Sequence, residues 1–189
     1  MGAASSNADT EARRDGATDQ ILQDGRQPTI GLTTEQVWRH LAKASFAVVS
    51  HVTPAGEPRS SGVLVKAIGQ RLYVVTAPDS WKARHIAMDG HLAVTVPVRR
   101  GGLLSLVTPI PPATISFHGT ARVHPAGTME VPKELAPLVP PERRASSCII
   151  EIIPEGAFVT YGIGVSVMKM RVPEKSRAHV PVNMNGAKR

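Results

Sequence analysis

A strand, a polar turn, a short helix and a second strand follow one another between residues 71 and 96. Residues 72–76 are apolar and β-branched, which is typical of a buried strand. Asp79 or Ser80 is placed to cap the helix that follows, so Lys82 and Arg84 fall in its first turn. Free backbone N–H groups at a helix start already favour an anion. Two cations at this end therefore predict a bound anion, and a phosphate fits that requirement.

The rest of the chain predicts a mainly β fold. Thr33 begins a helix with a capping pattern, and a strand covers Phe46–Val52. A tight turn leads into an expected second strand at residues 59–67. About six or seven strands joined mostly by short turns indicate an antiparallel β-barrel. The later elements are expected as strands at residues 91–98, 113–123, 147–153, 157–161 and 165–172, with short helices at 81–88 and 129–139.

Length and composition limit the domain organisation and the partners. A chain of 189 residues fits one domain, with a disordered leader at residues 1–27, a body at 28–172 and a polar tail at 173–189. The net charge of +7 favours an anionic ligand. Because the cations are spread along the chain and aromatic residues make up only 4%, nucleic acid is not an expected partner. No apolar run has the length of a membrane span, so we expect no membrane partner and a cytoplasmic location.

Residues suited to metal binding or hydrolysis do not form a recognisable pattern. The single cysteine, Cys148, lies in an apolar run and is expected to be a buried, unreactive thiol. The seven histidines lack the spacing of metal ligands, and His85 is expected at the surface or an interface. No catalytic triad or carboxylate pair is evident. The sequence therefore predicts no metal site, and it assigns no catalytic residue.

Four segments together resemble the pyridoxamine 5′-phosphate oxidase-like family of split β-barrels. The first is Phe46-Ala47-Val48-Val49-Ser50 with the turn Pro54-Ala55-Gly56-Glu57-Pro58, and the second is the strand Arg59-Ser60-Ser61-Gly62-Val63-Leu64-Val65-Lys66. The third is Val75-Thr76 followed by Ser80-Trp81-Lys82-x-Arg84, and the fourth is the strand at residues 115–123. The resemblance covers about 130 residues. It implies a split antiparallel β-barrel that binds FMN at a homodimer interface and acts as an oxidoreductase on a small-molecule substrate.

The resemblance also implies which residues bind the cofactor. Lys82 and Arg84 would hold the phosphate, with Lys66 and either Arg59 or Ser61 reaching it from the neighbouring strand. Val75 and Thr76 would bond the flavin ring or ribityl chain, Val63 would lie against the ring, and Thr114 occupies the position of an expected glutamine.

Some residues depart from the family pattern and leave alternatives open. Trp81 stands where the family has a cation, and it either packs on the flavin ring or covers the barrel. Arg59 and Lys66 are an odd number of residues apart, so they reach one phosphate only if a bulge intervenes. The C-terminal Arg and Trp motif for the vitamin substrate is missing, so vitamin B6 oxidation is not expected. A deazaflavin-dependent reductase and a non-catalytic flavin- or haem-binding module are the alternatives.

Overall fold

The protein is described by a computed structural model that covers residues 31–99, 112–139, 141–166, 170, 172 and 175–183. In these residues, two α-helices, two 3-10 helices and eight strands surround one apolar core. The elements are α2 (Thr34–Lys43), β1 (Phe46–Val52), β2 (Pro58–Leu64), β3 (Lys66–Ile68), β4 (Arg71–Thr76), α3 (Trp81–Met88), β5 (His91–Val98), β6 (Ala113–His124), η2 (Lys133–Leu138), η3 (Pro141–Ser146), β7 (Cys148–Tyr161) and β8 (Arg177–Pro181).

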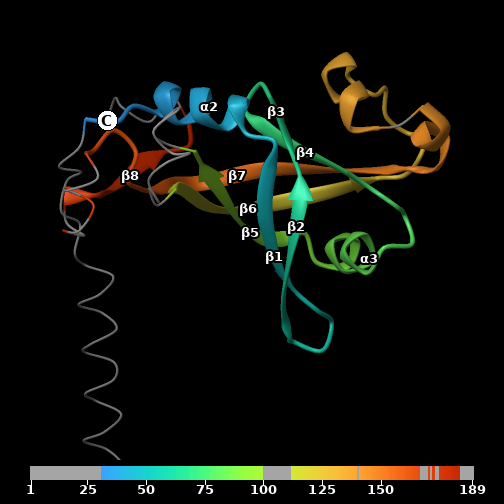
Figure 1. The fold of residues 1–189 in the computed structure, drawn as a ribbon. Coiled ribbons are helices and arrows are strands. Elements are labelled where there is room, and N and C mark those ends of the chain that lie inside the picture. The colour runs from blue at the N-terminus through green and yellow to red at the C-terminus, as the bar shows by residue number, and fades with distance from the viewer. Residues whose placement is uncertain are drawn as a thin grey trace, which may run out of the picture.

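The strands form one antiparallel sheet in the order β2-β1-β5-β6-β7-β4-β3, with β8 also paired to β7. The strands at the two ends of this order, β2 and β3, are consecutive in the chain and are separated only by Val65. The Val65 amide donates to the Ser45 carbonyl at 3.1 Å, which fixes the bend between the two strands. The chain therefore passes from one edge of the sheet directly to the other, which gives an incompletely closed barrel (Figure 1).

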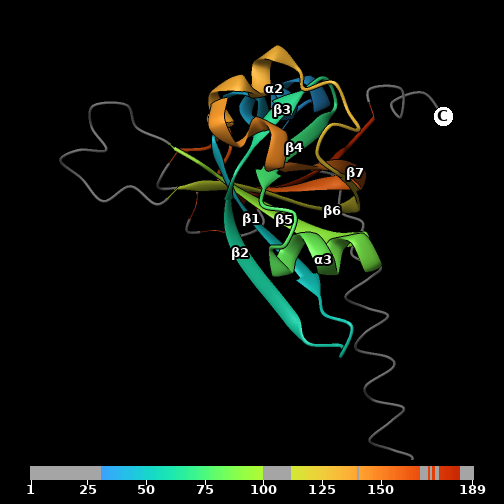
Figure 2. The same ribbon diagram turned by 90° about the vertical axis from the view of Figure 1, so that its right-hand side faces the viewer.

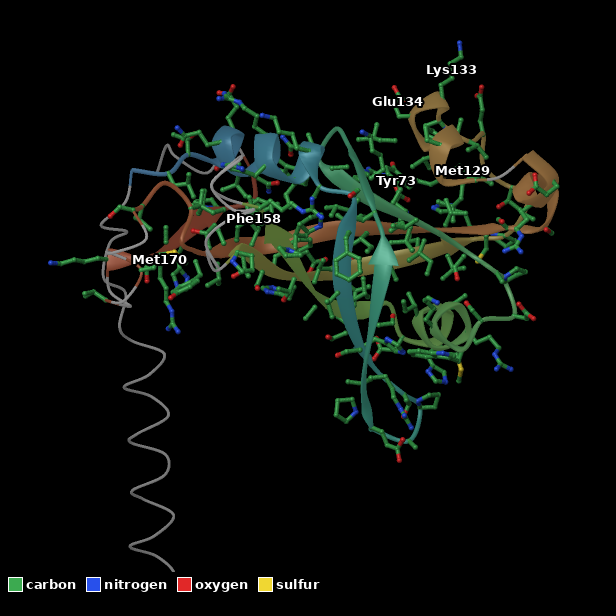
Figure 3. The ribbon with its side chains drawn as sticks, viewed as in Figure 1. Tyr73, Met129, Lys133, Glu134, Phe158 and Met170 are labelled. Carbon is green, nitrogen blue, oxygen red and sulfur yellow. The ribbon has the colours of Figure 1, made fainter. Side chains whose placement is uncertain are left out.

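The core lies between the inner face of the sheet and helix α2. Thr33 caps α2 through a reciprocal capping box with Gln36, as the sequence predicts. The buried face of the helix carries Trp38, whose ring meets Phe158 edge to face at a centroid distance of 5.3 Å. The Trp38 indole also donates to the Val182 carbonyl at 3.2 Å. Figure 3 shows Phe158 beneath α2, so this aromatic pair joins the helix to β7.

Helix α3 packs against the lower part of the sheet, beside the β1–β2 hairpin (Figure 2). The hairpin turn contains Gly56 with φ of +82°, a backbone conformation that glycine adopts at little cost. The turn is closed by a hydrogen bond from the Thr53 amide to the Glu57 carbonyl at 2.9 Å. The buried residues Ala83 and Ile86 hold α3 against the sheet. The hairpin and α3 therefore form two walls around a shared space.

The predicted split antiparallel barrel is confirmed. The helix at residues 81–88 and the strands at 46–52 and 91–98 have the predicted bounds. Along β6, Ile115 and Phe117 face the core and are buried, while His118 faces outward and is exposed. The predicted helix at residues 129–139 is present only as the shorter 3-10 helix η2, which contains Pro137. Among the described residues, no helix has the length and apolar character needed to cross a membrane.

Three predictions about strands are wrong. The strand expected at residues 59–67 is divided at Val65 into β2 and β3. The two strands expected at 147–153 and 157–161 are one strand, β7, because a shift in register with β6 and the positive φ of Gly156 allow pairing to continue. The described residues of 165–172 form no strand, and the last strand is β8, inside the segment expected to be a polar tail. Alternate side chains of β8, Ala178 and Val180, are buried in the core.

Candidate functional site

Helix α3 begins with a polar turn that leaves its amino end open to an anion. Ser80 is the N-cap, and its hydroxyl accepts a hydrogen bond from the Ala83 amide at 3.4 Å. The Thr76 hydroxyl donates to the Ser80 hydroxyl at 3.3 Å, which ties the end of β4 to the start of α3. The first turn of α3 contains no acidic residue. The remaining N–H groups and the positive dipole end of α3 therefore have no carboxylate within the first turn, and the nearest one in the sequence is Asp79, before the cap.

Lys82 and Arg84 leave this helix in different directions. Two helical positions correspond to a rotation of about 200° around the axis, so the two side chains lie on nearly opposite sides of α3. The Lys82 ammonium lies 5.8 Å from the centre of the Trp81 ring, whereas Arg84 is exposed. The two cations therefore flank the helix start from separate sides and do not form one compact pair.

Trp81 and two histidines form an aromatic cluster between α3 and β1. Only 3% of His51 is exposed, and its ring stacks on Trp81 at a centroid distance of 5.3 Å and an interplanar angle of 29°. His51 Nε2 lies 3.3 Å from His85 Nδ1, within hydrogen-bond range. His51 Nδ1 is buried and has no hydrogen-bond partner among the described residues. Burial, followed by the nearby His85, lowers the pKa of His51, so the buried ring is held neutral.

A pocket opens beside this cluster. Its volume is about 590 Å³, which is within the usual range for small-molecule sites. Arg59 lies in its wall and donates to the Glu57 carboxylate at 2.9 Å. The pocket is lined by Thr53, Pro54, Ala55, Glu57 and Arg59 from the hairpin and by Trp81 and His85 from α3. The structure therefore brings together Arg59 and Trp81, two of the residues predicted to bind the cofactor.

Ser61 and Val63 share the inner face of β2 with Arg59. Ser61 is paired with Val49, and Arg59 with His51, so all four side chains face the same side of the hairpin. The Ser61 hydroxyl oxygen is buried without a hydrogen-bond partner among the described residues. Val63 is buried in the core. The unpaired Ser61 hydroxyl is a donor that an anionic ligand reaching the inner face of β2 can satisfy.

The remaining predicted residues lie elsewhere in the chain. Lys66 is paired with Tyr73 on the opposite side of the Val65 bend, and Val75 shares their face of the sheet. β2 pairs with β1 without a bulge from Arg59 to Leu64, which places Arg59 about 17 Å along the strand from the Val65 bend, and Lys66 lies beyond that bend in β3. Thr114 is paired with Pro97, near the end of β5 that is remote from α3. Lys66, Val75 and Thr114 are therefore not among the residues that line the pocket.

A second polar cluster, which the sequence did not indicate, surrounds Glu151 on the outer face of β7. The Glu151 carboxylate accepts hydrogen bonds from Arg71 and from Tyr73, and it lies 2.9 Å from His124 Nε2. Burial of Glu151 raises its pKa, but the hydrogen bonds from Arg71 and His124 outweigh burial and hold the pKa below its ordinary value. Figure 3 shows Tyr73, whose pKa is raised by burial and by Glu151. This network fixes β4 and β6 to β7.

Cys148 behaves as the sequence predicts. It is buried at the start of β7, and its thiol donates to the Thr76 carbonyl at 3.4 Å. Burial raises the pKa of the Cys148 thiol, which leaves it protonated and unreactive. Within the described ranges, no group of three or more His, Cys, Asp or Glu side chains is arranged to hold a metal ion.

Sequence reasoning missed the partnership of His51 and His85. The signal was present in β1, where Ala47, Val49 and His51 alternate as inward positions of one strand. A histidine at the third inward position is expected to be buried and to need a hydrogen-bond partner. The identity of that partner was not accessible, because His85 lies on a helix whose contact with β1 is set by the tertiary fold.

Solved structures share this fold at low sequence identity. General stress protein 26 from Bacillus anthracis superposes with a TM-score of 0.51 at 18% identity, over 67% of this chain and 92% of that chain. The haem storage protein HutZ from Vibrio cholerae superposes with a TM-score of 0.51 at 11% identity, over 70% and 98% of the two chains. A conserved hypothetical protein from Mycobacterium tuberculosis superposes with a TM-score of 0.52 at 15% identity, over 68% of this chain and 85% of that chain.

The sequence matches no protein-family model and no curated protein. The structural similarities therefore concern the course of the backbone and do not extend to the function of individual side chains. The chain has the split-barrel fold that its resemblance to the pyridoxamine 5′-phosphate oxidase-like family predicts.

Proposed function

We propose that this protein is a flavin-dependent oxidoreductase that binds FMN, with the cofactor phosphate at the start of α3. The observation that carries the proposal is the electrostatics of that helix start. Its free N–H groups have no acidic neighbour in the first turn, while Lys82 and Arg84 add positive charge on either side. A phosphate dianion balances both features through charge-assisted hydrogen bonds.

The buried Ser61 hydroxyl supports the same assignment. Ser61 has no partner among the described residues, and it shares the inner face of the hairpin with His51, which contacts α3 through Trp81. A phosphate oxygen or ribityl hydroxyl is a suitable partner for this group. The residues present at this end of the site therefore fit the phosphate-bearing end of a flavin.

The protein residues have binding and positioning roles in this proposal. The flavin supplies the hydride chemistry when it is bound. Lys82 and Arg84 hold the phosphate, and the hydrogen bond from Thr76 to Ser80 keeps the turn in place. Trp81 replaces the family's cation and covers the site with an apolar ring. We assign no acid or base, because no side chain is yet tied to a reacting atom.

The proposal includes a homodimer with the flavin at its interface and a small-molecule substrate. Phe46 and Leu64 are paired across β1 and β2, and they are 44% and 59% exposed. Exposed large apolar side chains that lie side by side favour burial against a partner. A second protomer placed here would bring its own residues close to the Val65 bend and Lys66. In this arrangement, Lys66, Val75 and Thr114 contact the flavin from parts of the dimer that one protomer does not bring together.

The visible spectrum of the purified protein tests which cofactor is used. Oxidised flavin bands support the proposal, whereas a deazaflavin spectrum favours the deazaflavin-dependent reductase. A haem spectrum favours the haem-binding module, the function named for HutZ, which shares the fold. If the protein isolated without a cofactor binds none of FMN, deazaflavin and haem, all three functions are excluded.

The phosphate assignment is tested with two matched ligands and two matched variants. FMN and riboflavin differ only in the phosphate, so Lys82→Ala with Arg84→Ala should weaken FMN binding at least tenfold and leave riboflavin binding unchanged. Lys133→Ala with Lys175→Ala removes the same charge at exposed positions elsewhere, and it should change neither affinity. An equal loss for FMN and riboflavin, or no loss for FMN, would show that the phosphate lies elsewhere.

A further inference from the structure

The pocket between the hairpin turn and α3 adjoins the proposed phosphate site at Trp81. Trp81 belongs to both: it is the first residue of α3, next to Lys82, and its ring lines the pocket. The pocket has a volume of about 590 Å³, and it extends along the hairpin turn to Thr53 and Ala55. A flavin phosphate held at the helix start would therefore leave space beyond it for a further group.

The walls of the pocket are apolar in part and carry a cation. Pro54, Ala55 and the 40% exposed ring of Trp81 provide an apolar surface for a flat group. Arg59 provides a guanidinium, which is now paired with Glu57 in an ion pair whose side chains are more than half exposed. Exposed ion pairs of this kind contribute little to stability. An anionic ligand can therefore compete with Glu57 for Arg59, and a phosphate can accept two of its hydrogen bonds at once.

The His51–His85 hydrogen bond determines which nitrogen of His85 remains for a ligand. Neutral imidazole has one donor and one acceptor nitrogen. If His51 Nε2 donates to His85 Nδ1, the buried His51 Nδ1 is an unpaired acceptor and His85 Nε2 carries a hydrogen. If His85 Nδ1 donates to His51 Nε2 instead, His51 Nδ1 carries a buried hydrogen that has no acceptor. A buried N–H without an acceptor is rarer and costlier than a buried acceptor without a donor. The first arrangement is favoured, and it leaves the Nε2–H of His85 as a donor at the pocket wall.

From these contacts we propose that the pocket binds a planar aromatic group joined to a phosphate, as in a nucleoside monophosphate. The aromatic group lies against Trp81 and Pro54, and the phosphate is held by Arg59 and the Nε2–H of His85. The same chemistry has two sources: the nucleotide half of a dinucleotide cofactor, or a separate nucleotide substrate. Nucleotide binding is inferred from the residues of the pocket alone, and only a role of the pocket in redox chemistry rests on the proposed function.

The test uses 5′-AMP and adenosine, which share the aromatic group and differ in the phosphate. Trp81 is the more exposed of the two tryptophans, because only 8% of Trp38 is exposed. Binding of 5′-AMP should therefore quench the protein fluorescence, with adenosine at least tenfold weaker. Arg59→Gln should weaken 5′-AMP binding at least fivefold, whereas Glu57→Gln should strengthen it by removing the competing carboxylate. Lys133→Gln, which changes an exposed charge elsewhere, should have no effect.

The outcomes separate this inference from the proposed function. The pocket assignment is overturned, even if FMN binds, by any of three results. These are equal binding of 5′-AMP and adenosine, no binding of either, and the same change in 5′-AMP affinity for Arg59→Gln and Glu57→Gln. Binding of 5′-AMP with the expected variant effects supports it even if FMN does not bind. If FAD binds more tightly than FMN and loses that advantage in Arg59→Gln, the pocket holds part of the cofactor. If 5′-AMP binds equally well to the FMN-loaded protein, the pocket holds a separate nucleotide.

Discussion

His51 Nε2 and His85 Nδ1 are 3.3 Å apart, and they join a buried position of β1 to a half-buried position of α3. Trp81, four residues before His85, stacks over the buried ring. The packing of α3 on β1 therefore depends on an imidazole that is not easily charged.

The stability of the protein should fall as His51 is forced to take a proton. Burial and His85 lower the pKa of His51 below its ordinary value of 6.5, so the unfolded chain binds this proton more readily than the folded one. Stability is therefore retained above about pH 6.5 and lost as pH falls below it. The free energy of unfolding, measured with urea, should differ less between pH 8 and pH 5.5 for His51→Phe than for the wild type. An equal difference in both proteins would contradict this origin of the pH dependence.

Glu151 should make a separate contribution at lower pH. Despite burial, Arg71 and His124 hold the pKa of Glu151 below its ordinary value of 4.5. The stabilising contribution is thus present above about pH 4.5 and disappears as pH falls through the lower folded pKa. Glu151→Gln should be less stable at pH 7 and should lose less stability between pH 5 and pH 3. Glu134→Gln, on the exposed 3-10 helix of Figure 3, should behave like the wild type in the same measurement.

Gly119 should not tolerate a side chain. A β-carbon at this position would overlap the backbone carbonyl oxygen of Ile153 on the neighbouring strand, which has no freedom to move aside. Gly119→Ala should therefore cost at least about 3 kcal/mol of unfolding free energy or prevent folding. Gly31→Ala, which would meet nothing within 4 Å, provides the control. A Gly119→Ala protein with the melting temperature of the control would show that β6 and β7 are further apart.

The capping box of α2 should make a modest, separable contribution. The Thr33 hydroxyl accepts from the Gln36 backbone amide at 3.3 Å, and the Gln36 side-chain oxygen accepts from the Thr33 backbone amide at 2.9 Å. Thr33→Ala should lower the unfolding free energy by about 1 kcal/mol, while Thr33→Ser retains the acceptor and should lose less. Thermal unfolding distinguishes the two variants, and equal losses would assign the effect to the methyl group of Thr33.

Local patterns were sufficient to predict most elements of the fold. The β-branched run at residues 72–76, the Ser80 cap and the glycine turns each specify their structure over a few residues. β8 was missed because its alternation of Ala178 and Val180 with charged and polar residues is short and lies in a polar composition. The break at Val65 was missed because nothing local distinguishes it. It is set by the hydrogen bond from Val65 to Ser45, twenty positions earlier in the chain.

The candidate site was predictable only in part, for a related reason. Lys82 and the helix start are local features, and the structure retains both. The approach of Arg59 to Trp81 depends on how a hairpin folds over a helix, and the His51–His85 bond depends on the same contact. The predicted convergence of Arg59 with Lys66 required a bulge, and the regular pairing of β1 with β2 does not provide one. These relationships belong to the tertiary fold, so spacing along the chain did not specify them.

Strand β7 is shared between two groups of strands, because its first part pairs with β4 and its last part with β8, while β6 follows most of its length. Separating β4 or β8 from the sheet breaks hydrogen bonds to β7, the strand with which the other one also pairs. Amide protons of β4 and β8, although about a hundred residues apart in the sequence, should therefore exchange with deuterium at similar, slow rates set by global unfolding. Among the described strands, the β1–β2 hairpin pairs only within itself and with β5. Its amides are free to exchange through smaller openings, which allows the wall of the pocket to move while the sheet behind it stays intact.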